Sequence, residues 1–206
     1  MSDKKQEKMF RELIRKRRSV REFRKKPVEP GKIAALVEAA LRSPSSRGLD
    51  PWEFIVVTDR ELLQKLSRSK PHGAAFLAGA PLGIVVCTDA TRSDVWVEDA
   101  SIASIYIWLA AESLGLGACW IQIRLRPYDE NQSARDYLAQ LLRLPSHLQV
   151  EAIVAVGYPK RKNPPHLKAN LKYDKVSFNF YCEPYSEKAG QDRIGREGGI
   201  NRKGVK

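Results

Sequence analysis

Hydrophobic and polar positions along the chain follow two different periods. Short apolar runs rich in β-branched residues are typical of buried strands, and apolar residues three and four positions apart are typical of helices. The runs predict strands at Trp52–Thr58, Leu82–Cys87, Ala118–Leu125 and Val150–Val156. The helical spacing predicts helices at Met9–Ile14, Ile33–Leu41, Ala74–Ala80, Val95–Leu114 and Ser133–Leu142, and one more after Asp59 that contains Leu62, Leu63 and Leu66. Strands and helices therefore alternate along the chain.

The segment from Val95 to Leu114 contains no Gly or Pro and is apolar nearly all round. A helix with one apolar face lies on a surface, whereas a helix that is apolar on all sides is buried. Gly115, which follows, is a residue that commonly ends a helix. We therefore expect this segment to be the central buried helix of the fold.

The two ends of the chain differ from its middle. Residues 1–8 are polar and basic, and we expect them to be flexible. Residues 160–185 show little periodicity but carry many aromatic side chains, so this part should dock on something. Residues 186–206 hold five glycines and six basic residues, a composition that predicts a disordered tail.

Composition favours one compact domain, because 43% of the 206 residues are hydrophobic and 29% are charged. Cys87, Cys119 and Cys182 are odd in number and widely spaced, so we expect no disulfide framework and a reducing, cytoplasmic location. The most apolar stretch, Ile102–Ala111, is far shorter than the ~20 residues that span a bilayer. The N-terminal residues contain no apolar signal core, and we expect a protein that is neither secreted nor membrane-spanning.

The net charge of +12 favours an anionic partner. The charge is distributed unevenly along the chain. Residues 1–26 hold twelve basic and four acidic side chains, so most of the excess lies there. This excess indicates either a solvated basic arm or a phosphate site. A rival interpretation is a non-catalytic adaptor that grips nucleic acid. We expect no nucleic-acid partner, because Trp52, Trp108 and Trp120 fall in apolar segments and leave no basic face with exposed stacking rings.

Several familiar sites can be excluded. The three histidines are scattered and the cysteines lack C-x-x-C spacing, so we predict no metal site. The chain contains neither a phosphate loop of the G-x-x-x-x-G-K-[ST] type nor a G-x-S-x-G elbow. Gly115 and Gly117 follow a predicted helix, whereas a dinucleotide fingerprint follows a strand. Cys119 lies in a strongly apolar segment, which favours a core thiol over a nucleophile.

Three segments remain as candidates for chemistry. Arg17–Arg21 supplies guanidinium groups and a hydroxyl within five residues, which suits an anion with several oxygens. Pro44–Gly48 is a small polar loop that leads into a strand, and it is also compatible with an ordinary helix-to-strand connection. Leu114–Gln122 combines a tight turn with a strand whose backbone could face a flat ring.

These segments, in this order, resemble the FMN-dependent nitroreductase family over roughly residues 9–185. The similarity is carried by Arg17-Arg18-Ser19-Val20-Arg21-Glu22-Phe23, by Ser43-Pro44-Ser45-Ser46 with Pro51-Trp52-Glu53-Phe54-Ile55-Val56-Val57, by Leu114-Gly115-Leu116-Gly117-Ala118-Cys119-Trp120-Ile121, and by Val156-Gly157-Tyr158-Pro159. The resemblance implies an α+β fold with a central mixed β-sheet flanked by helices. It also implies a homodimer with FMN at the interface and a C-terminal extension that wraps the partner.

The resemblance also assigns residues to the cofactor. Carried over by position, the phosphate would be held by Arg17, Arg18 and Ser19, with Arg21 nearer the pyrimidine side of the flavin. Pro44, Ser45 and Ser46 would approach from the other subunit, and Trp120, Ile121 and Gln122 would run beside the isoalloxazine ring with a backbone N–H near N5. Arg161 and Lys162 would complete the phosphate site.

Two departures from the family pattern concern the flavin and the substrate face. Gly48 and Asp50 stand where many members have Asn and Gln, which removes expected side-chain hydrogen bonds to the flavin. Gln122-Ile123 stands where many members have Gly-Gly, so Ile123 is expected to narrow the substrate pocket. Arg124 and His72 are further candidates for substrate contact, although surface or loop roles are also compatible with both.

The reaction expected from the resemblance is hydride transfer from NAD(P)H through flavin N5 to a small electron-poor acceptor, such as a nitroaromatic, a quinone or an enone, by a ping-pong mechanism. The flavin carries the hard chemistry, so no catalytic side-chain acid or base is obligatory. Reductive dehalogenation and flavin fragmentation stay open as alternative reactions of the same fold. The sequence contains no dedicated 2′-phosphate site or ribose-binding acid, and the choice between NADH and NADPH stays open as well.

Overall fold

The computed structural model describes residues 3–161 and 163–185, so the predicted tail at 186–206 and the phosphate candidate Lys162 lie outside the described residues. Five α-helices and four strands make up the main unit, which extends to Pro165. The elements are α1 (Asp3–Lys16), α2 (Pro30–Leu41), β1 (Trp52–Val57), α3 (Arg60–Leu66), β2 (Leu82–Asp89), α4 (Trp96–Ser113), β3 (Gly117–Gln122), α5 (Ala134–Leu142) and β4 (Leu148–Gly157), with short 3-10 helices η1 (Ser46–Gly48) and η2 (Ala75–Gly79).

The four strands form one sheet in the order β1-β2-β4-β3, and all three pairings are antiparallel. The resemblance implied a mixed sheet. Among the described residues, parallel pairing next to these strands is limited to the single bridge between Ser19 and Ala118. β1 and β3 are therefore the two outer strands, and in the part of the chain that the structure describes the added bridge lies on the edge of β3.

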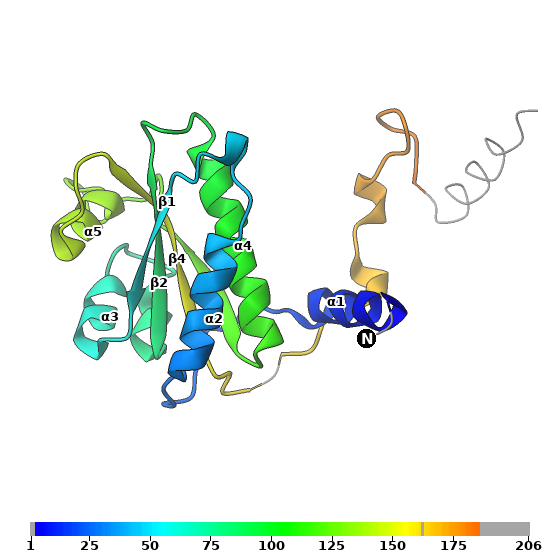
Figure 1. Cartoon of the computed structure of the whole chain (residues 1–206), viewed down its shortest axis with the longest axis horizontal. Helices are drawn as coiled ribbons and strands as arrows, with labels where there is room; N and C mark the ends of the chain where they lie inside the picture. The colour runs from blue at the N-terminus through cyan, green and yellow to red at the C-terminus, as the bar shows by residue number, and fades with distance from the viewer. Residues whose placement is uncertain (1–2, 162, 186–206) are drawn as a thin grey trace, which may run out of the picture. The chain divides into compact units, whose positions relative to one another are not determined.

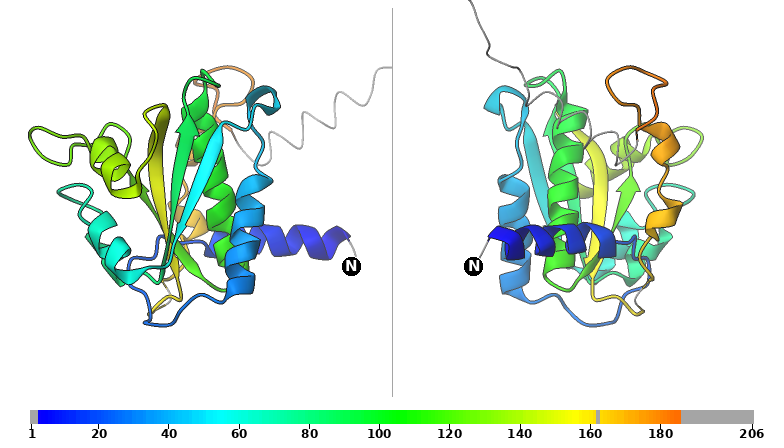
Figure 2. Two further views of the ribbon diagram at one scale, coloured as in Figure 1. Left: turned by 60° about the vertical axis from the view of Figure 1, so that its left-hand side comes forward. Right: turned by 90° about the vertical axis from the view of Figure 1, so that its right-hand side faces the viewer.

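Helices cover both faces of the sheet (Figures 1 and 2). On one face α2 and α4 pack over a core that includes Leu36, Ile107 and Val154. On the other face α3, η2 and α5 pack over a second core that includes Ile121 and Ile153. β2 and β4 carry nearly continuous apolar runs because both of their faces are covered. α4 is the long helix that the sequence predicted, but it is not buried on all sides in this chain, because Ile105 and Tyr106 are about 40% exposed.

Two element boundaries differ from the sequence prediction. α1 begins at Asp3 rather than near Met9, so the residues expected to be flexible include helical ones. β3 ends at Gln122 instead of continuing to Leu125, because the backbone N–H groups of Ile123 and Arg124 both donate to the Glu151 carbonyl, at 3.0 and 3.1 Å. Leu125 then adopts a positive φ of 57° and is exposed, which stops the extended conformation.

Two glycines let the chain after α1 cross the end of the sheet. Gly117 of β3 and Gly157 of β4 are directly paired, and a Cβ on Gly117 would lie 2.5 Å from Cγ2 of Val20. A Cβ on Gly157 would lie 2.9 Å from Cδ1 of Phe23. The bare backbone at this point therefore allows residues 19–24 to lie directly against β3 and β4.

The described residues 166–185 belong to a second compact unit. Its described part contains two short 3-10 helices, η3 (Lys168–Asn170) and η4 (Tyr173–Lys175), and an antiparallel bridge between Ser177 and Pro184. Phe180 and Tyr181 are exposed to 70% and 93% of their surface in this chain. That this aromatic segment docks on something stays a prediction.

Candidate functional site

The outer edge of β3 is open beyond Ala118. The Val20 N–H donates to the Ala118 carbonyl at 3.0 Å, so the backbone groups of Ala118 point away from β4. Because alternate residues of an antiparallel strand point to the same side, the backbone groups of Trp120 and Gln122 also face outward. The edge thus presents N–H donors and a carbonyl acceptor in the plane of the sheet, where a flat heterocycle can pair with them.

The predicted basic segment crosses this edge. The Arg17 guanidinium lies 4.7 Å from the centre of the Trp108 ring on α4, and that of Arg21 lies 5.8 Å from the Phe76 ring on η2. Both guanidinium groups act on the thiol of Cys119 in β3. Burial raises the pKa of the Cys119 thiol, and the charges of Arg21 and Arg17, with the Ser19 hydroxyl, act in the opposite direction. The segment thus gathers cationic groups at β3, and the buried Cys119 agrees with the predicted core thiol.

A hollow of about 510 Å³ opens beside this segment. Three predicted phosphate or flavin residues line it, namely Ser19, Arg21 and Arg161, together with Asn163. Asn163 donates its amide to the Ser19 carbonyl at 3.2 Å, and Arg161 forms an ion pair with Glu22. Arg18 lines a neighbouring hollow of about 600 Å³ that also includes Arg161, and its guanidinium bonds to the Pro164 carbonyl. The structure thus brings Ser19, Arg21 and Arg161 together and keeps Arg18 next to them.

A lysine that the sequence analysis missed reaches the open edge. Lys70 follows α3, and its Nζ donates to the Gln122 carbonyl at 2.8 Å. Burial, followed by the charge of Arg126, lowers the pKa of Lys70 below its ordinary value. A single lysine in a loop gives no sequence signal, because only the fold shows that the loop ends beside β3.

The Gln122 side chain is held by three hydrogen bonds. Its Oε1 accepts from the Trp120 indole N–H at 2.8 Å, and its Nε2 donates to Glu151 Oε1 at 3.0 Å and to the Arg124 carbonyl at 3.3 Å. Glu151 is only 3% exposed, and its Oε2 has no hydrogen-bond partner. The sequence analysis missed Glu151, which lies inside an apolar strand. The signal that could have found it is a single Glu between Val150 and Ala152.

The predicted loop Pro44–Ser46 lies at the other end of α4. Ser45 Oγ donates to Asp50 at 2.6 Å and accepts from the Asp50 N–H at 2.9 Å, and the Ser46 N–H donates to Asp99 at 2.8 Å. Asp50 thus holds Ser45 within its own loop. Pro44 is exposed and has no hydrogen-bonding role of its own here.

The structure separates this loop from the basic segment within one chain. Asp99, which binds Ser46, and Trp108, which stacks with Arg17, are nine residues apart on α4. Nine residues of an α-helix rise about 13 Å and make about two and a half turns. The two contacts therefore lie on opposite faces of α4. One chain therefore does not bring Ser45 and Ser46 to the basic segment.

The predicted substrate residues have different environments. Ile123 is completely buried in the core beside α5, with Ile121, so neither side chain reaches solvent. Ile123 also lines a hollow of about 480 Å³ together with Trp96 and Arg124, and its contact with substrate stays a prediction. Arg124 is half-buried, 5.6 Å from the Trp96 ring, and its Nε lies 4.0 Å from Glu151 Oε2. His72 is an exposed loop residue.

Among residues 3–161 and 163–185, no group of three or more His, Cys, Asp or Glu side chains is placed to hold a metal ion. Within the same described residues, no helix has both the length and the apolar character needed to cross a bilayer.

Comparison with known proteins assigns the family. The model of the nitroreductase family matches residues 14–71 and 67–158. An FMN-dependent nitroreductase from Clostridium difficile R20291 superimposes with a TM-score of 0.81 and 46% identity, covering 82% of this chain and 98% of that one. A protein from Archaeoglobus fulgidus, provisionally named NADH dehydrogenase/NAD(P)H nitroreductase, is 38% identical over 152 residues, 72% of this chain and 84% of its own. Iodotyrosine deiodinase from Thermotoga neapolitana is 26% identical over 185 residues, 76% of this chain and 92% of its own. The chain belongs to the nitroreductase family.

Proposed function

We propose that the protein is an FMN-dependent oxidoreductase that passes hydride from NAD(P)H to a small electron-poor acceptor, a nitroaromatic, quinone or enone. The observation that carries this proposal is the open edge of β3, bordered by Arg17, Arg21 and Lys70. Similarity to an FMN-dependent nitroreductase supports the cofactor, and similarity to a provisionally named NAD(P)H nitroreductase supports the reductant.

The donor set suits FMN at both ends of the molecule. A phosphate carries several oxygens, and the hollow of Ser19, Arg21 and Arg161 supplies a hydroxyl and two guanidinium groups. A flavin ring carries donors and acceptors along one edge, and the outward backbone of Trp120 and Gln122 supplies the complementary groups. The hollow would therefore hold the phosphate, and the outer edge of β3 would hold the flavin ring.

FMN, when bound, supplies a ring atom that accepts hydride from one partner and gives it to the next. The chain's own residues bind and orient it. The Gln122 N–H is the donor that we assign to the reacting edge. Lys70 and Arg21 provide positive charge, which stabilises negative charge that develops during reduction. No side chain is assigned as catalytic acid or base.

We also propose that the active form is a homodimer in which the partner contributes its Ser45–Ser46 loop. The support is the arrangement on α4, where the loop and Arg17 contact opposite faces of the helix. A site that needs both segments is incomplete in one chain, and a second copy of the chain can supply the missing loop.

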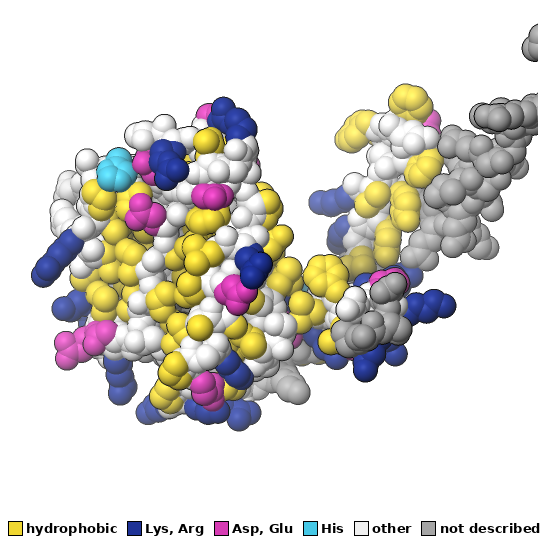
Figure 3. All heavy atoms as spheres, in the orientation of Figure 1, with side chains coloured by type: hydrophobic (Ala, Val, Ile, Leu, Met, Phe, Trp, Pro, Cys, Tyr) yellow, Lys and Arg dark blue, Asp and Glu magenta, His cyan; other side chains and the backbone are white. Residues whose placement is uncertain are grey.

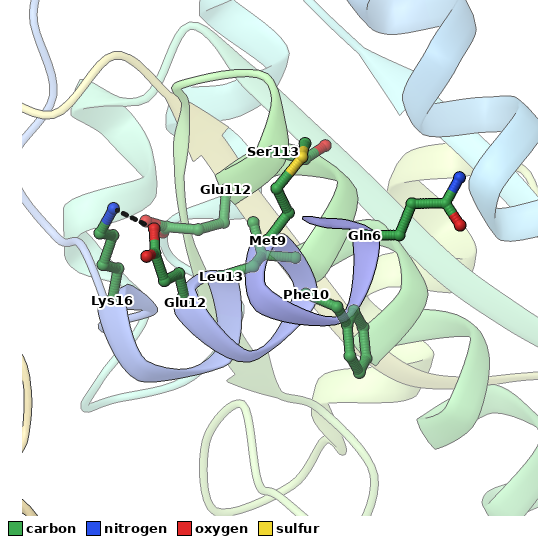
Figure 4. A pocket seen from close by; sticks show the side chains of 8 residues that line it. All are labelled: Gln6, Met9, Phe10, Glu12, Leu13, Lys16, Glu112 and Ser113. Carbon is green, nitrogen blue, oxygen red and sulfur yellow. Dashed lines mark hydrogen bonds and ion pairs between the residues drawn. The ribbon is translucent and has the colours of Figure 1, made fainter. Parts of the chain in front are cut away.

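Exposed apolar side chains support the same dimer. Met9, Phe10 and Ile14 of α1 are each at least 50% exposed, and Ile105 and Tyr106 of α4 are about 40% exposed. A hollow of about 490 Å³ between α1 and α4 is lined by Met9, Phe10 and Leu13 (Figure 4). On the face seen in Figure 3, hydrophobic side chains form further open patches. Such surfaces are typical of interaction sites.

Flavin titration tests the cofactor. FMN should bind and lose fluorescence. Arg21→Ala removes a guanidinium group from the phosphate hollow and should weaken binding by about 1.5–3 kcal/mol, as expected for a charge-assisted hydrogen bond. Arg42→Ala is the matched control, because Arg42 is an exposed arginine that pairs only with Glu38 on α2. Absence of quenching in the unaltered protein would refute the cofactor, and equal affinity of both variants would move the phosphate elsewhere.

Steady-state kinetics test the reaction. One flavin face serves reductant and acceptor in turn, so parallel double-reciprocal lines are expected with a small quinone. Intersecting lines, with both partners bound together, would contradict the shared face.

Similarity to iodotyrosine deiodinase keeps reductive dehalogenation as the second candidate reaction, and release of iodide from an iodophenol would favour it.

Light scattering tests the dimer. The flavin-loaded protein should have twice the chain mass of 23.3 kDa, and a mass of one chain would refute the shared site.

A cytoplasmic location remains part of the proposal and rests on the free thiols Cys87 and Cys119.

A further inference from the structure

Glu151 occupies an irregular position in β4. The register with β2 steps from Val86–Ala152 to Cys87–Val150, which leaves Glu151 without a partner on β2. An extra residue of this kind is a β-bulge, and bulges next to functional sites redirect a side chain. The Glu151 carboxylate accordingly meets Gln122 of β3, although the partner of Gln122 in the strand register is Ala152.

The carboxylate contributes little to the stability of the strand. Glu151 is 3% exposed, its Oε2 has no hydrogen-bond partner, and the nearest cation, Arg124, remains 4.0 Å away. Burial raises the pKa of Glu151, with the Gln122 hydrogen bond and Arg124 opposing this effect and the charge of Glu98 adding to it. A buried acid with an unpaired oxygen costs free energy, so its presence needs a reason other than packing.

That reason is the direction of the Gln122 amide. With Glu151 and the Arg124 carbonyl as acceptors for Nε2, the Gln122 oxygen is left to face the Trp120 indole N–H. If the amide turned over, its NH₂ group would face another donor and its oxygen would face two acceptors. Lys70 meanwhile holds the Gln122 carbonyl at 2.8 Å from the outer side. Gln122 is therefore fixed through its side chain and through its backbone.

We propose that Glu151 is a positioning residue for the reaction, acting through Gln122 to fix Trp120 and the outward N–H of Gln122 at the open edge of β3. The inference rests on the proposed function, because the flavin ring is the group that this edge would face. Glu151 itself touches neither cofactor nor substrate in this assignment. It supplies the acceptor that makes one orientation of Gln122 much more favourable than the other.

Two substitutions separate an acceptor from a charge. Glu151→Gln keeps an oxygen that can accept from Gln122 and removes the charge, whereas Glu151→Leu removes both. The first readout is the Trp120 indole N–H signal in ¹⁵N NMR of the flavin-free protein, assigned with Trp120→Phe. The second is the FMN dissociation constant. Glu38→Gln serves as the control for the loss of a carboxylate, because Glu38 lies on α2 and pairs with the exposed Arg42.

Glu151→Leu should move the Trp120 indole signal toward that of a free indole and weaken FMN about fivefold to tenfold, the effect of one hydrogen bond. Glu151→Gln and Glu38→Gln should leave both readouts near those of the unaltered protein. If both Glu151 variants change the two readouts equally, the charge of Glu151 matters and the positioning role is overturned. If neither variant changes them, the positioning role is overturned as well. If Glu151→Leu does not fold, Glu151→Met, which removes the acceptor and keeps an unbranched side chain, must move the Trp120 indole signal toward that of a free indole.

The test also separates this inference from the proposed function. If the unaltered protein binds FMN and the Trp120 indole signal is unchanged in Glu151→Leu, the positioning role fails and the proposed function survives. If the unaltered protein binds no FMN, the proposed function fails, and the role in the reaction fails with it.

Discussion

Gly117→Ala should damage both stability and cofactor binding, because it inserts one methyl group where residues 19–24 lie against β3. The added Cβ would stand 2.5 Å from Val20 Cγ2, 2.8 Å from Val20 Cβ and 3.1 Å from Pro159 Cγ. Ordinary carbon contacts are about 3.5–4.0 Å, so Val20 must retreat by about 1 Å. Val20 is 7% exposed, and retreat stretches its 3.0 Å hydrogen bond to the Ala118 carbonyl.

The size of the effect follows from these contacts. Overpacking costs about 1–3 kcal/mol, and weakening the buried hydrogen bond adds about 1 kcal/mol, so unfolding should become easier by about 2–4 kcal/mol. Because Ser19 and Arg21 flank Val20, the same displacement should weaken FMN. Urea unfolding at fixed protein concentration measures the first effect, and flavin fluorescence titration measures the second.

Gly31→Ala is the matched control. Gly31 lies in the first turn of α2, and a Cβ there meets nothing within 4 Å, so this substitution should leave stability unchanged or slightly higher and FMN affinity unchanged. The reasoning is refuted if Gly117→Ala unfolds within about 0.5 kcal/mol of the unaltered protein, the range of an ordinary surface substitution. It is equally refuted if Gly31→Ala weakens FMN as much as Gly117→Ala does.

Three further outcomes are expected. Hydrogen bonds from Lys26 and then Tyr158 lower the pKa of Glu29 from 4.5 to about 2, so the ionised group stabilises the fold above pH 4.5 and loses this effect as pH falls toward 2. The stability difference between the unaltered protein and Glu29→Gln should therefore shrink over that interval in urea unfolding, and a constant difference would contradict the assignment. Lys70→Met keeps most of the side-chain volume and removes a charge beside β3, so the midpoint potential of bound FMN should fall by tens of mV in a dye-coupled titration; an unchanged potential would remove Lys70 from the site. Ile123→Ala should lower the free energy of unfolding by about 2–5 kcal/mol through a core cavity and leave the range of acceptors unchanged, and a broader range at full stability would place Ile123 on the substrate face.

Most of the fold is predictable from the sequence because its strands are apolar runs with clear ends. β2 and β4 are covered on both faces and read as continuous hydrophobic segments, and α4 reads as a long helix between a polar loop and Gly115. The basic segment is also recognisable, since guanidinium groups and a hydroxyl stand within five residues. These signals are local, and the chain needs no distant contact to produce them.

The parts that were missed depend on contacts between distant residues. Lys70 and Gln122 are far apart in sequence and meet because the loop after α3 ends beside β3. Glu151 reaches Gln122 because a bulge turns it, and a bulge leaves no sequence pattern. Ile123 is different, because strand alternation from the predicted core residue Cys119 already placed it on the same buried side.

The opposite orientation of the two contacts on α4 has a consequence for mixtures of defective chains. If each flavin is bound by the basic segment of one copy and the Ser45–Ser46 loop of the other, a copy that lacks Arg17 and a copy that lacks Ser46 have complementary lesions. In a dimer made of one copy of each, one site carries both defects and the other carries neither. At an FMN concentration too low to fill either defective homodimer, the two variants, unfolded and refolded together, should therefore regain activity in mixed dimers, with one working site in each.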